Sequence, residues 1–279
     1  MSIRKLYYAL PPGLRLLARK LYYLPVDVWA SVSGKRGRYE PPRGDIYIGS
    51  GDFIQQGRHQ LDLLQRYIDL QAADAVLDVG SGIGRTAVAL TTFLNLEARY
   101  EGFDVVEKGV AWCNATIRRD FPNFNFQYVP LNNDLYNNSK QKAVEFRFPY
   151  GDAQFDKVFL FSVFTHMQIE EIAHYLCEIA RVLRPGGQCL ATFFLYNRQN
   201  ENQVMARPGF HFPVKKDGFR LMDEQVKSAN IALDEQRLDE FITTAGLRRI
   251  RLVQGYWMDP AMKTADNTFQ DVLVLQKTV

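Results

Sequence analysis

Residues 76–85 read V-L-D-V-G-S-G-I-G-R, and this stretch carries the clearest structural signal in the chain. A short apolar run, interrupted at Asp78, is followed by three glycines at alternate positions. Glycine permits a tight turn and lets backbone N–H groups approach a ligand closely. A segment with helical spacing begins at residue 86, and a helix N-terminus favours negative charge. The stretch therefore predicts a strand, a ligand-binding loop and a helix, in that order.

Helical and strand-like apolar patterns alternate on both sides of this stretch. Helices are predicted at 59–70, 86–94, 109–117, 169–183 and 238–246, and strands at 75–80, 100–106, 124–129, 155–161, 188–195, 247–257 and 269–276. Strands separated by helices of this length indicate βαβ units and a parallel sheet, which is an α/β, doubly wound fold. The last two strands are adjacent in the chain, so we expect a closing hairpin that makes one edge antiparallel.

The composition is ordinary for a globular protein. The chain has 279 residues, of which 47% are hydrophobic and 23% charged, and this length suggests one large domain with additions. Three scattered cysteines argue against a disulfide framework and fit a reducing cytosol. The four histidines show no ligand spacing with cysteine, so we expect no metal site.

Positive charge is concentrated at the N-terminus. Residues 1–43 contain nine Lys or Arg and two acids, so the rest is slightly acidic and a globally basic nucleic-acid binder is disfavoured. Leu14, Leu17, Leu21 and Leu24 share one helical face, and we expect Pro25 to end that helix. We interpret 1–45 as a basic amphipathic arm and 46–279 as the main domain. The arm could bind an anionic membrane surface or a partner protein, or pack on its own domain with its bases in water.

No stretch is predicted to cross a membrane. No uncharged run exceeds 13 residues, the length of 185–197, whereas a spanning helix needs roughly 20 apolar residues. Pro11, Pro12 and Gly13 interrupt what would be the apolar core of a signal peptide, so we expect the N-terminus to be retained. We therefore expect a cytoplasmic protein, with peripheral membrane attachment through the arm as an alternative.

The glycine spacing separates two classes of nucleotide-binding enzyme. The pattern is G-x-G-x-G, not the G-x-G-x-x-G of dinucleotide binders, which disfavours a nicotinamide-dependent oxidoreductase. Asp78 lies two residues before the first glycine, and a second acid, Asp104, ends the next predicted strand.

Four motifs in order give the chain a family resemblance. They are L-D-V-G-S-G-I-G (77–84), G-F-D-V-V (102–106), F-P-Y-G-D-A-Q-F-D-K-V-F (148–159) and I-A-R-V-L-R-P-G-G (179–187). With them the chain resembles class I S-adenosylmethionine-dependent methyltransferases over roughly residues 58–196. The resemblance implies a Rossmann-like, seven-stranded, mostly parallel sheet whose last strand inserts antiparallel, and S-adenosyl-L-methionine as cofactor.

The resemblance also implies roles for individual residues. The loop residues line the methionine part of the cofactor: Gly80, Ser81, Gly82 and Gly84. Asp78 would orient this loop near the ammonium group, and Val105 would pack on the adenine. Asp104 would accept hydrogen bonds from both ribose hydroxyls, because a carboxylate has two acceptor oxygens; the alternative is a strand-end turn residue.

The third strand departs from the family pattern. The chain reads V-P-L-N-N-D at 129–134, and Pro130 occupies the position where the family often places an acid that reads the adenine amino group. Leu131 through its backbone, Asn132 and Asn133 are the candidates that remain. Asp152, just before the fourth strand, is interpreted as a turn residue.

The end of the fourth strand, F-S-V-F-T-H-M (161–167), is the predicted place of methyl transfer. Ligands sit at the carboxyl ends of parallel strands, so Phe161 and Ser162 are expected beside the sulfonium. His166 is the candidate catalytic base, because an imidazole can take a proton from a hydroxyl near neutral pH. The alternatives are that His166 caps the next helix or forms a structural hydrogen bond. Arg85 could bind a carboxylate or brace the glycine loop.

Two long connections, about 130–150 and 198–232, are predicted to be lids of the acceptor site. The second contributes candidate pocket residues whose roles the sequence does not define: Phe210, His211, Phe212, Lys215, Lys216 and Arg220. A third segment, 46–57, is glycine-rich around Phe53, and Tyr47 and Phe53 are candidate lid contacts, with core packing as the alternative.

The leading functional hypothesis is O-methylation of a small molecule or glycan, including a lipid-linked one. The chain lacks the D-P-P-Y-like motif of nucleobase amino-methyltransferases, the Pro-Cys pair used to attack pyrimidine carbon and the Asp/Asp-Asn metal set of catechol-type enzymes, and no nucleic acid is expected as partner. N-methylation of an amine or protein side chain and a non-catalytic binding or scaffold module are the alternatives.

Overall fold

The computed structural model describes residues 12–47, 49, 51–132, 139, 141–205, 207–224, 226, 229–265 and 267–278. The chain forms two units. The first comprises the chain up to residue 66, 71–73 and 80–141, and the second comprises 67–70, 74–79 and the chain from 142 onward. Predictions for residues 1–11 of the arm, for Asn133 and for most of 133–140 lie outside the described residues.

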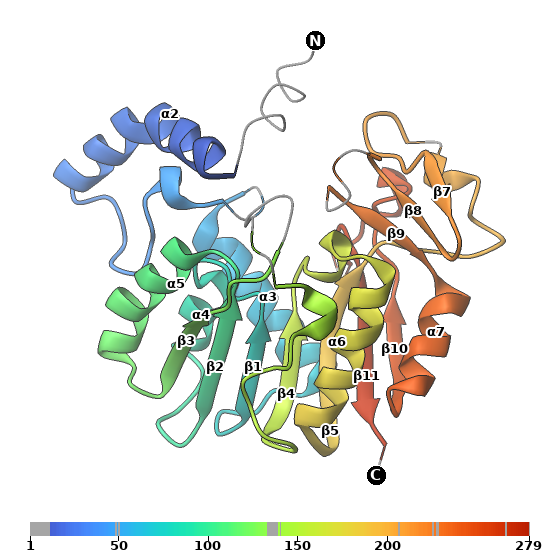
Figure 1. The fold of residues 1–279 in the computed structure, drawn as a ribbon. Helices are drawn as coiled ribbons and strands as arrows, with labels where there is room; N and C mark the ends of the chain where they lie inside the picture. The colour runs from blue at the N-terminus through green and yellow to red at the C-terminus, as the bar shows by residue number, and fades with distance from the viewer. Residues whose placement is uncertain are drawn as a thin grey trace. The chain divides into compact units, whose positions relative to one another are not determined.

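In its described residues, the first unit contains two parallel strands and four α-helices. The elements are α2 (Pro12–Val32), the turn η1 (Arg43–Asp45), α3 (Phe53–Ile68, ending in the second unit), α4 (Arg85–Leu90), β2 (Arg99–Asp104), α5 (Glu107–Cys113), the π-helical turn η2 (Asn114–Arg118) and β3 (Phe124–Tyr128). Strands β2 and β3 pair in parallel, from Tyr100 opposite Phe124 to Asp104 opposite Tyr128. Figure 1 shows these elements from blue to green.

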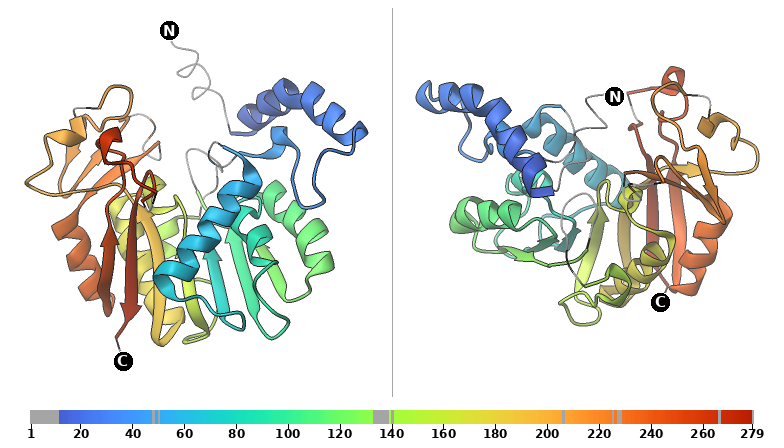
Figure 2. Two further views of the ribbon diagram at one scale, coloured as in Figure 1. Left: turned by 180° about the vertical axis from the view of Figure 1, so that it is seen from behind. Right: turned by 45° about the horizontal axis from the view of Figure 1, so that its top comes forward.

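The second unit contains the other strands. They are β1 (Ala75–Val79), β4 (Phe155–Leu160), β5 (Leu183–Phe193), β6 (Leu195–Tyr196), β7 (Val214–Lys216), β8 (Phe219–Leu221), β9 (Ile231–Asp234), β10 (Leu247–Val253) and β11 (Asp271–Lys277). Its α-helices are α6 (Ile169–Val182) and α7 (Glu235–Thr244), with 3-10 turns η3 (Ala143–Glu145), η4 (Phe164–His166), η5 (Gln203–Met205) and η6 (Pro260–Met262). Seen from behind in Figure 2, β10 and β11 lie in front of α7.

The strands form two sheets. The main sheet has seven strands in the order β10-β11-β5-β4-β1-β2-β3, and the small sheet has four in the order β6-β9-β8-β7. Strand β11 is antiparallel to both β5 and β10, whereas β1, β4 and β5 are parallel. This confirms the predicted α/β class and the seven-stranded, mostly parallel sheet.

The helices and strands predicted from the sequence are present, and β10 and β11 form the predicted antiparallel pair at one edge of the sheet, with β11 inserted between β10 and β5. Three details of the prediction are wrong. Strand β5 begins at Leu183, and the P-G-G turn forms an irregularity inside its pairing with β4. Pro25 lies inside α2 and does not end it. The connection 198–232 is not irregular throughout, since it supplies most of the small sheet.

An aromatic cluster packs the small sheet onto the rest of the second unit. Phe194, Tyr196, Val204, Phe212, Ala232 and Trp257 are buried together, with Phe210, Met222, Met258 and Phe269 against them. Phe194 lies 5.3 Å from the ring of Trp257 and 5.6 Å from that of Phe212. Phe212, predicted as a pocket residue, is therefore a core residue.

A buried carboxylate fixes the chain around this cluster. Asp271, the first residue of β11, accepts hydrogen bonds from the backbone N–H groups of Leu195 and Gly255 at 2.7 and 2.8 Å, and from Trp257 Nε1 at 2.8 Å. Burial raises the pKa of Asp271 to about 6 despite these donors. One side chain thus joins the start of β6, the loop after β10 and the start of β11.

We expect Asp271→Ala to lower the free energy of unfolding by about 3 kcal/mol or more, because three buried donors lose their acceptor. Urea denaturation followed by Trp257 fluorescence measures the change. Asp259→Ala is the control: Asp259 also accepts a backbone hydrogen bond, from Ala261 N, but at an exposed turn, so its loss should cost about 1 kcal/mol or less. Equal stabilities of the two variants would contradict the proposed role of Asp271.

Candidate active site

The glycine loop between β1 and α4 is held against the end of β2. Gly80, Gly82 and Gly84 have φ of 78°, 59° and 76°, in the left-handed region that glycine adopts without strain. The N–H groups of Gly80 and Ser81 both donate to the carbonyl oxygen of Phe103, at 2.9 and 3.0 Å. The sequence prediction of a tight glycine turn before a helix is confirmed.

Close packing also restricts the residue at position 84. A Cβ on Gly84 would lie 2.7 Å from Ile117 Cδ1 and 2.8 Å from Cys113 Sγ, in the helical segment after β2. Gly84 is the N-cap of α4, so the absent side chain lets this helix begin beside α5 and η2. The third glycine is therefore needed for packing as well as for backbone conformation.

Asp104 lies at the centre of the hydrogen bonds that join the loop to β2. Its Oδ2 accepts from Gly82 N and its Oδ1 from Val106 N, both at 2.8 Å. Burial raises the pKa of Asp104 to about 6, and the hydrogen bonds from these amides and from the Tyr47 hydroxyl act in the opposite direction. A buried carboxylate at the end of a strand, next to a glycine loop, can accept hydrogen bonds from the hydroxyl groups of a ligand.

Tyr47 connects the segment before α3 to this carboxylate. Its hydroxyl acts on Asp104 by lowering the pKa of that carboxyl, and it lies over Gly109 of α5, where a Cβ would come within 2.2 Å of it. The sequence indicated Tyr47 as a lid contact but did not indicate its effect on Asp104, because 57 residues separate the two in the chain. The glycine at 109 is the one local signal that something must approach α5 closely.

Phe53 and Arg85 pack beneath the same segment. Phe53, at the start of α3, is buried, as the core-packing alternative states, and the Arg85 guanidinium lies 5.7 Å from its ring. Burial lowers the pKa of Arg85. A Cβ on Gly49 would lie 3.0 Å from Arg85 Nη1, so Arg85 contacts the glycine-rich segment that carries Tyr47.

Two further predicted cofactor residues lie at strand ends. Asp78 is buried in β1 of the second unit, in register with Phe159 of β4. Val105 follows β2 directly and is partly exposed in the first unit. The predicted roles of Asp78 at the ammonium group and of Val105 at the adenine stay predictions.

After β3, residues 131 and 132 pair with Gln141, about ten residues further along the chain. Leu131 is buried and forms a parallel bridge with Gln141, and Asn132 N donates to Gln141 O at 2.8 Å. The side chain of Asn132 is exposed. Of the two predicted adenine contacts in the described part of the chain, Leu131 thus anchors the connection and Asn132 is accessible to a ligand.

The end of β4 has an unusual backbone. Ser162 has φ of 59°, rare for a residue with a side chain, and such conformations cluster at functional sites. Its N–H donates to Thr192 Oγ1 at 2.7 Å, and its Oγ donates to Gln270 Oε1 at 2.9 Å. Phe161 lies beside it, with its ring 5.8 Å from that of Phe159. Sequence reasoning missed Thr192 and Gln270, which come from other strand ends.

His166 ends the 3-10 turn η4 and is partly exposed. The next helix, α6, begins after Gln168, whose N–H donates to Glu171 Oε2 at 2.7 Å. Gln168 is therefore the N-cap, and the alternative in which His166 caps this helix is wrong. The role of His166 as a base stays a prediction.

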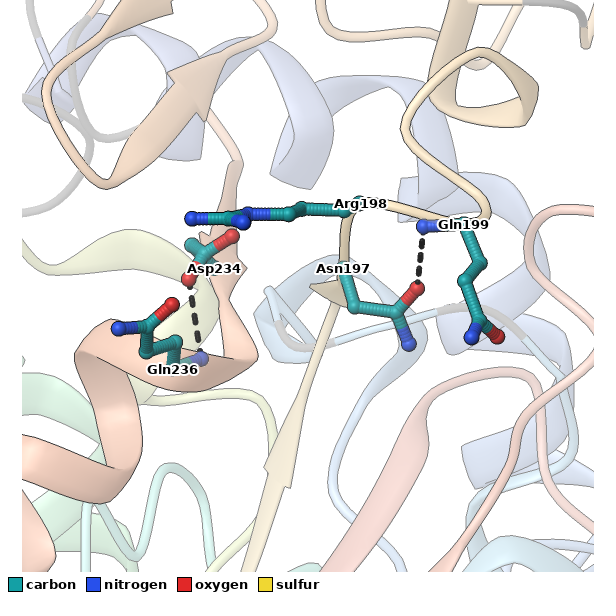
Figure 3. Close-up of a pocket in the computed structure, with 5 residues that line it drawn as sticks. All are labelled: Asn197, Arg198, Gln199, Asp234 and Gln236. Carbon is teal, nitrogen blue, oxygen red and sulfur yellow. Dashed lines mark hydrogen bonds between the residues drawn. The ribbon is translucent and has the colours of Figure 1, made fainter.

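Three of the predicted pocket residues in the 198–232 connection, Lys215, Lys216 and Arg220, form ion pairs with glutamates. Arg220 Nη2 and Lys215 Nζ lie 2.7 and 2.8 Å from Glu201 Oε1, and Lys216 pairs with Glu224 at 3.2 Å. His211 is exposed. A pocket of about 370 Å³ opens at the base of this sheet, lined by Asn197, Arg198, Gln199, Asp234 and Gln236 (Figure 3). None of the predicted cofactor residues lines it.

Comparisons with known proteins agree with this fold. Residues 77–191 match the family described as a methyltransferase domain. The 27-O-demethylrifamycin SV methyltransferase of Amycolatopsis mediterranei is 29% identical over 140 residues, which cover 48% of this chain and 43% of that protein. The chain spans about half the length of the curated relatives it matches.

Two solved structures have a similar fold. The 1,6-didemethyltoxoflavin-N1-methyltransferase of Burkholderia thailandensis, with bound 1,6-didemethyltoxoflavin and S-adenosylhomocysteine, is 17% identical with a TM-score of 0.52, covering 97% of this chain and 91% of that chain. The [4+2]-cyclase SpnF is 18% identical with a TM-score of 0.55, covering 95% and 97%. Residues 77–191 thus match a methyltransferase domain, and the fold of the chain is similar to the folds of these two structures.

The raised pKa of Asp104 predicts how ligand binding depends on pH. Ribose hydroxyls would donate to the ionised carboxylate, so S-adenosylhomocysteine should bind best above pH 6 and up to about tenfold more weakly at pH 5, where most Asp104 is protonated. Isothermal titration between pH 5 and 7 measures this. Asp104→Asn should bind more weakly with a flat profile.

Glu101→Gln is the matched control, because burial also raises the pKa of Glu101 on the same strand, where its Oε1 accepts from Asn125. It should leave the affinity and its pH dependence unchanged. A flat profile in the unaltered protein would contradict the assignment of Asp104 to the ribose.

Tyr47→Phe should move the same profile to higher pH. The hydroxyl of Tyr47 lowers the pKa of Asp104, so its removal leaves the carboxyl protonated over a wider range. Tyr39→Phe is the control, because Tyr39 donates at 2.9 Å to a different carboxylate, that of the partly buried Asp120. An identical midpoint in Tyr47→Phe and the unaltered protein would show that this contact does not control Asp104.

Proposed function

We propose that this protein is an S-adenosyl-L-methionine-dependent methyltransferase that methylates a hydroxyl oxygen of a small molecule. The observation that carries the proposal is the hydrogen-bond arrangement at Asp104. One buried carboxylate accepts from Gly82 N of the glycine loop and Val106 N after β2, so loop and carboxylate are held together before any ligand arrives. Pre-organisation of this kind lowers the cost of binding.

The residues of the first unit fit the proposed cofactor. Asp104 would hold the ribose, Val105 the adenine, and the backbone of Gly80, Ser81, Gly82 and Gly84 the methionine part. Glycine is needed at two positions around this site. A Cβ at Gly84 would clash with Ile117 and Cys113, and a Cβ at Gly109 would clash with the Tyr47 hydroxyl and the carbonyl oxygen of Gly82. Leu131 and Asn132 complete the proposed set in this unit, and Asp78 and Phe161 are cofactor contacts proposed for the second unit. Displacement of the Tyr47 hydroxyl from Asp104 would free an acceptor position for a ribose hydroxyl.

The proposed cofactor, when bound, supplies an activated methyl group on a sulfonium. The protein must then hold acceptor oxygen, methyl carbon and sulfur in line, and such orientation can contribute on the order of 7–11 kcal/mol. His166 would take the hydroxyl proton on a ring nitrogen as the oxygen–methyl bond forms and the sulfur–methyl bond breaks, with the sulfur leaving as a neutral thioether. No triad or metal is required for this step.

Oxygen is the proposed acceptor atom because the relative from Amycolatopsis mediterranei is named for an O-demethyl compound, 27-O-demethylrifamycin SV, and a relative from Aspergillus nomiae is named an O-methyltransferase. A glycan or lipid-linked acceptor is a finer form of the same proposal. The aromatic cluster of the small sheet, with Phe210 and Phe269 only partly buried, supports an acceptor with an apolar surface. We further propose that the enzyme works in the cytoplasm, where its three free cysteines stay reduced.

Two measurements test the proposal. Titration with S-adenosylhomocysteine and with NADH should give binding only to the first. Incubation with S-adenosylmethionine and a library of alcohols, phenols, glycosides and amines, followed by mass spectrometry and NMR, should give an O-methyl product. Methylation of nitrogen would support the alternative acceptor class. Cofactor binding without turnover of any acceptor would favour a binding module and contradict the proposal.

The pH profile of turnover tests His166. His166→Ala and His166→Gln should lower kcat by about 10²–10⁴-fold and remove the rise of activity from pH 6 to 9, because the base is lost while cofactor binding is kept. His211→Ala, at an exposed histidine of the 198–232 connection, is the control and should retain the profile. Full turnover by His166→Ala across this range would show that His166 is not the base.

A further inference from the structure

Helix α2 packs on the first unit through its polar side. Lys20 Nζ lies 2.9 Å from Asp45 Oδ1, and Asp27 accepts from the N–H groups of Arg43 and Gly44 at 2.7 and 2.9 Å. A Cβ on Gly44 would lie 2.9 Å from Lys20 Cα, so the turn η1 touches the helix backbone. Figure 1 shows α2 above η1. Among the described side chains of α2, those of Arg19, Tyr23, Asp27 and Ala30 are partly buried, and Asp27 supplies the hydrogen bonds from this side to η1.

The apolar side of α2 faces outward. Leu17, Leu21, Leu24 and Val28 recur at helical spacing and are each at least half exposed, from 51% to 62%. The aromatic residues Tyr22 and Trp29 flank this stripe, at 77% and 59% exposed. An amphipathic helix packed on its own domain buries its apolar stripe, and this helix does the reverse. An exposed apolar face of this size marks an interaction surface.

Cations lie beside this stripe, without acids on it. Lys35 Nζ lies 4.5 Å from the centre of the Trp29 ring, and the loop that follows the helix carries Arg36 and Arg38. The two acids of residues 12–43 are engaged elsewhere: Asp27 with η1, and Glu40 with the N–H of Gly37. Positive charge next to an exposed apolar face is complementary to a surface that is anionic outside and apolar beneath.

The loop after α2 ties this surface to the first unit. Tyr39 donates to Asp120 Oδ2 at 2.9 Å, and Arg38 Nη2 lies 2.7 Å from the same oxygen. The helix is therefore fixed at both the loop and η1, and its apolar face is presented on a folded base. No helix in the described ranges is long and apolar enough to cross a membrane.

We propose that α2 docks onto an anionic membrane surface, with the Leu17–Leu21–Leu24–Val28 stripe and Trp29 inserted among the lipids and Lys35 and Arg36 at the headgroups. The helix lies in the plane of the interface, as interfacial amphipathic helices do. The proposal concerns location and does not depend on the reaction catalysed. The experiments below distinguish membrane binding from binding of a second copy of this chain or of a protein partner on the same face.

Sedimentation of the full-length protein with vesicles tests the proposal. The protein should pellet with vesicles of phosphatidylcholine and phosphatidylserine, bind those of phosphatidylcholine alone more weakly, and dissociate at high salt. Leu21→Glu/Val28→Glu should reduce the partition coefficient by at least about tenfold, since it removes apolar contact and adds negative charge. Leu96→Glu/Met262→Glu, at exposed apolar positions outside α2, is the matched control and should bind normally.

Tryptophan fluorescence gives a second readout. Trp29 is exposed whereas Trp257 is buried, so a blue shift on adding anionic vesicles should be lost in Trp29→Phe. Equal pelleting of the Leu21→Glu/Val28→Glu variant and the control pair would overturn the proposal, as would no pelleting of the unaltered protein. Analytical ultracentrifugation separates self-association: a dimer that Leu21→Glu/Val28→Glu converts to a monomer, without vesicle binding by either form, assigns the face to a second copy instead.

Discussion

The buried carboxylate of Asp104 is the constraint on which the candidate active site depends. Its two oxygens accept from Gly82 N and Val106 N, so the loop before α4 and the loop before α5 take the shape that satisfies one charge. Burying that charge is costly, as the pKa of about 6 shows, and the amide donors offset part of the cost. The glycines follow from this arrangement, because side chains at positions 84 and 109 would separate the parts that it joins.

The second unit uses the same device at Asp271. Two backbone amides and the Trp257 indole converge on its carboxylate, which sets the position of the aromatic cluster under the small sheet. Burial raises the pKa of both carboxyls from 3.8 to about 6. A raised pKa in the folded state means that each group favours folding below about pH 4, and that this contribution is lost as the pH rises through 6. Both sites therefore hold ionised carboxylates at neutral pH at the expense of stability.

The N-terminal arm shows how an amphipathic pattern can be satisfied in two ways. Its leucines share a face, and this pattern alone fits both a helix whose apolar face packs on the core and a helix whose apolar face binds another surface. The side that packs is instead set by Asp27 and Lys20, whose partners lie in and beside η1. Because those polar contacts hold the helix, its apolar face stays outward. A sequence pattern identifies such a face, and only the partners of its opposite side show where it points.

The sequence by itself determined the order of helices and strands, the glycine loop and the acids at the ends of β1 and β2, because these signals lie within a few neighbouring residues. It also placed Phe161, Ser162 and His166 after β4. The tertiary structure decided where β11 inserts, that 198–232 forms a sheet of very short strands, that Pro25 is accommodated inside α2, and that Tyr47 reaches Asp104. These features depend on pairings between distant segments. The hydrophobic periodicity of a segment indicates which of its residues form an apolar face, but it does not identify the distant residues that pack against that face.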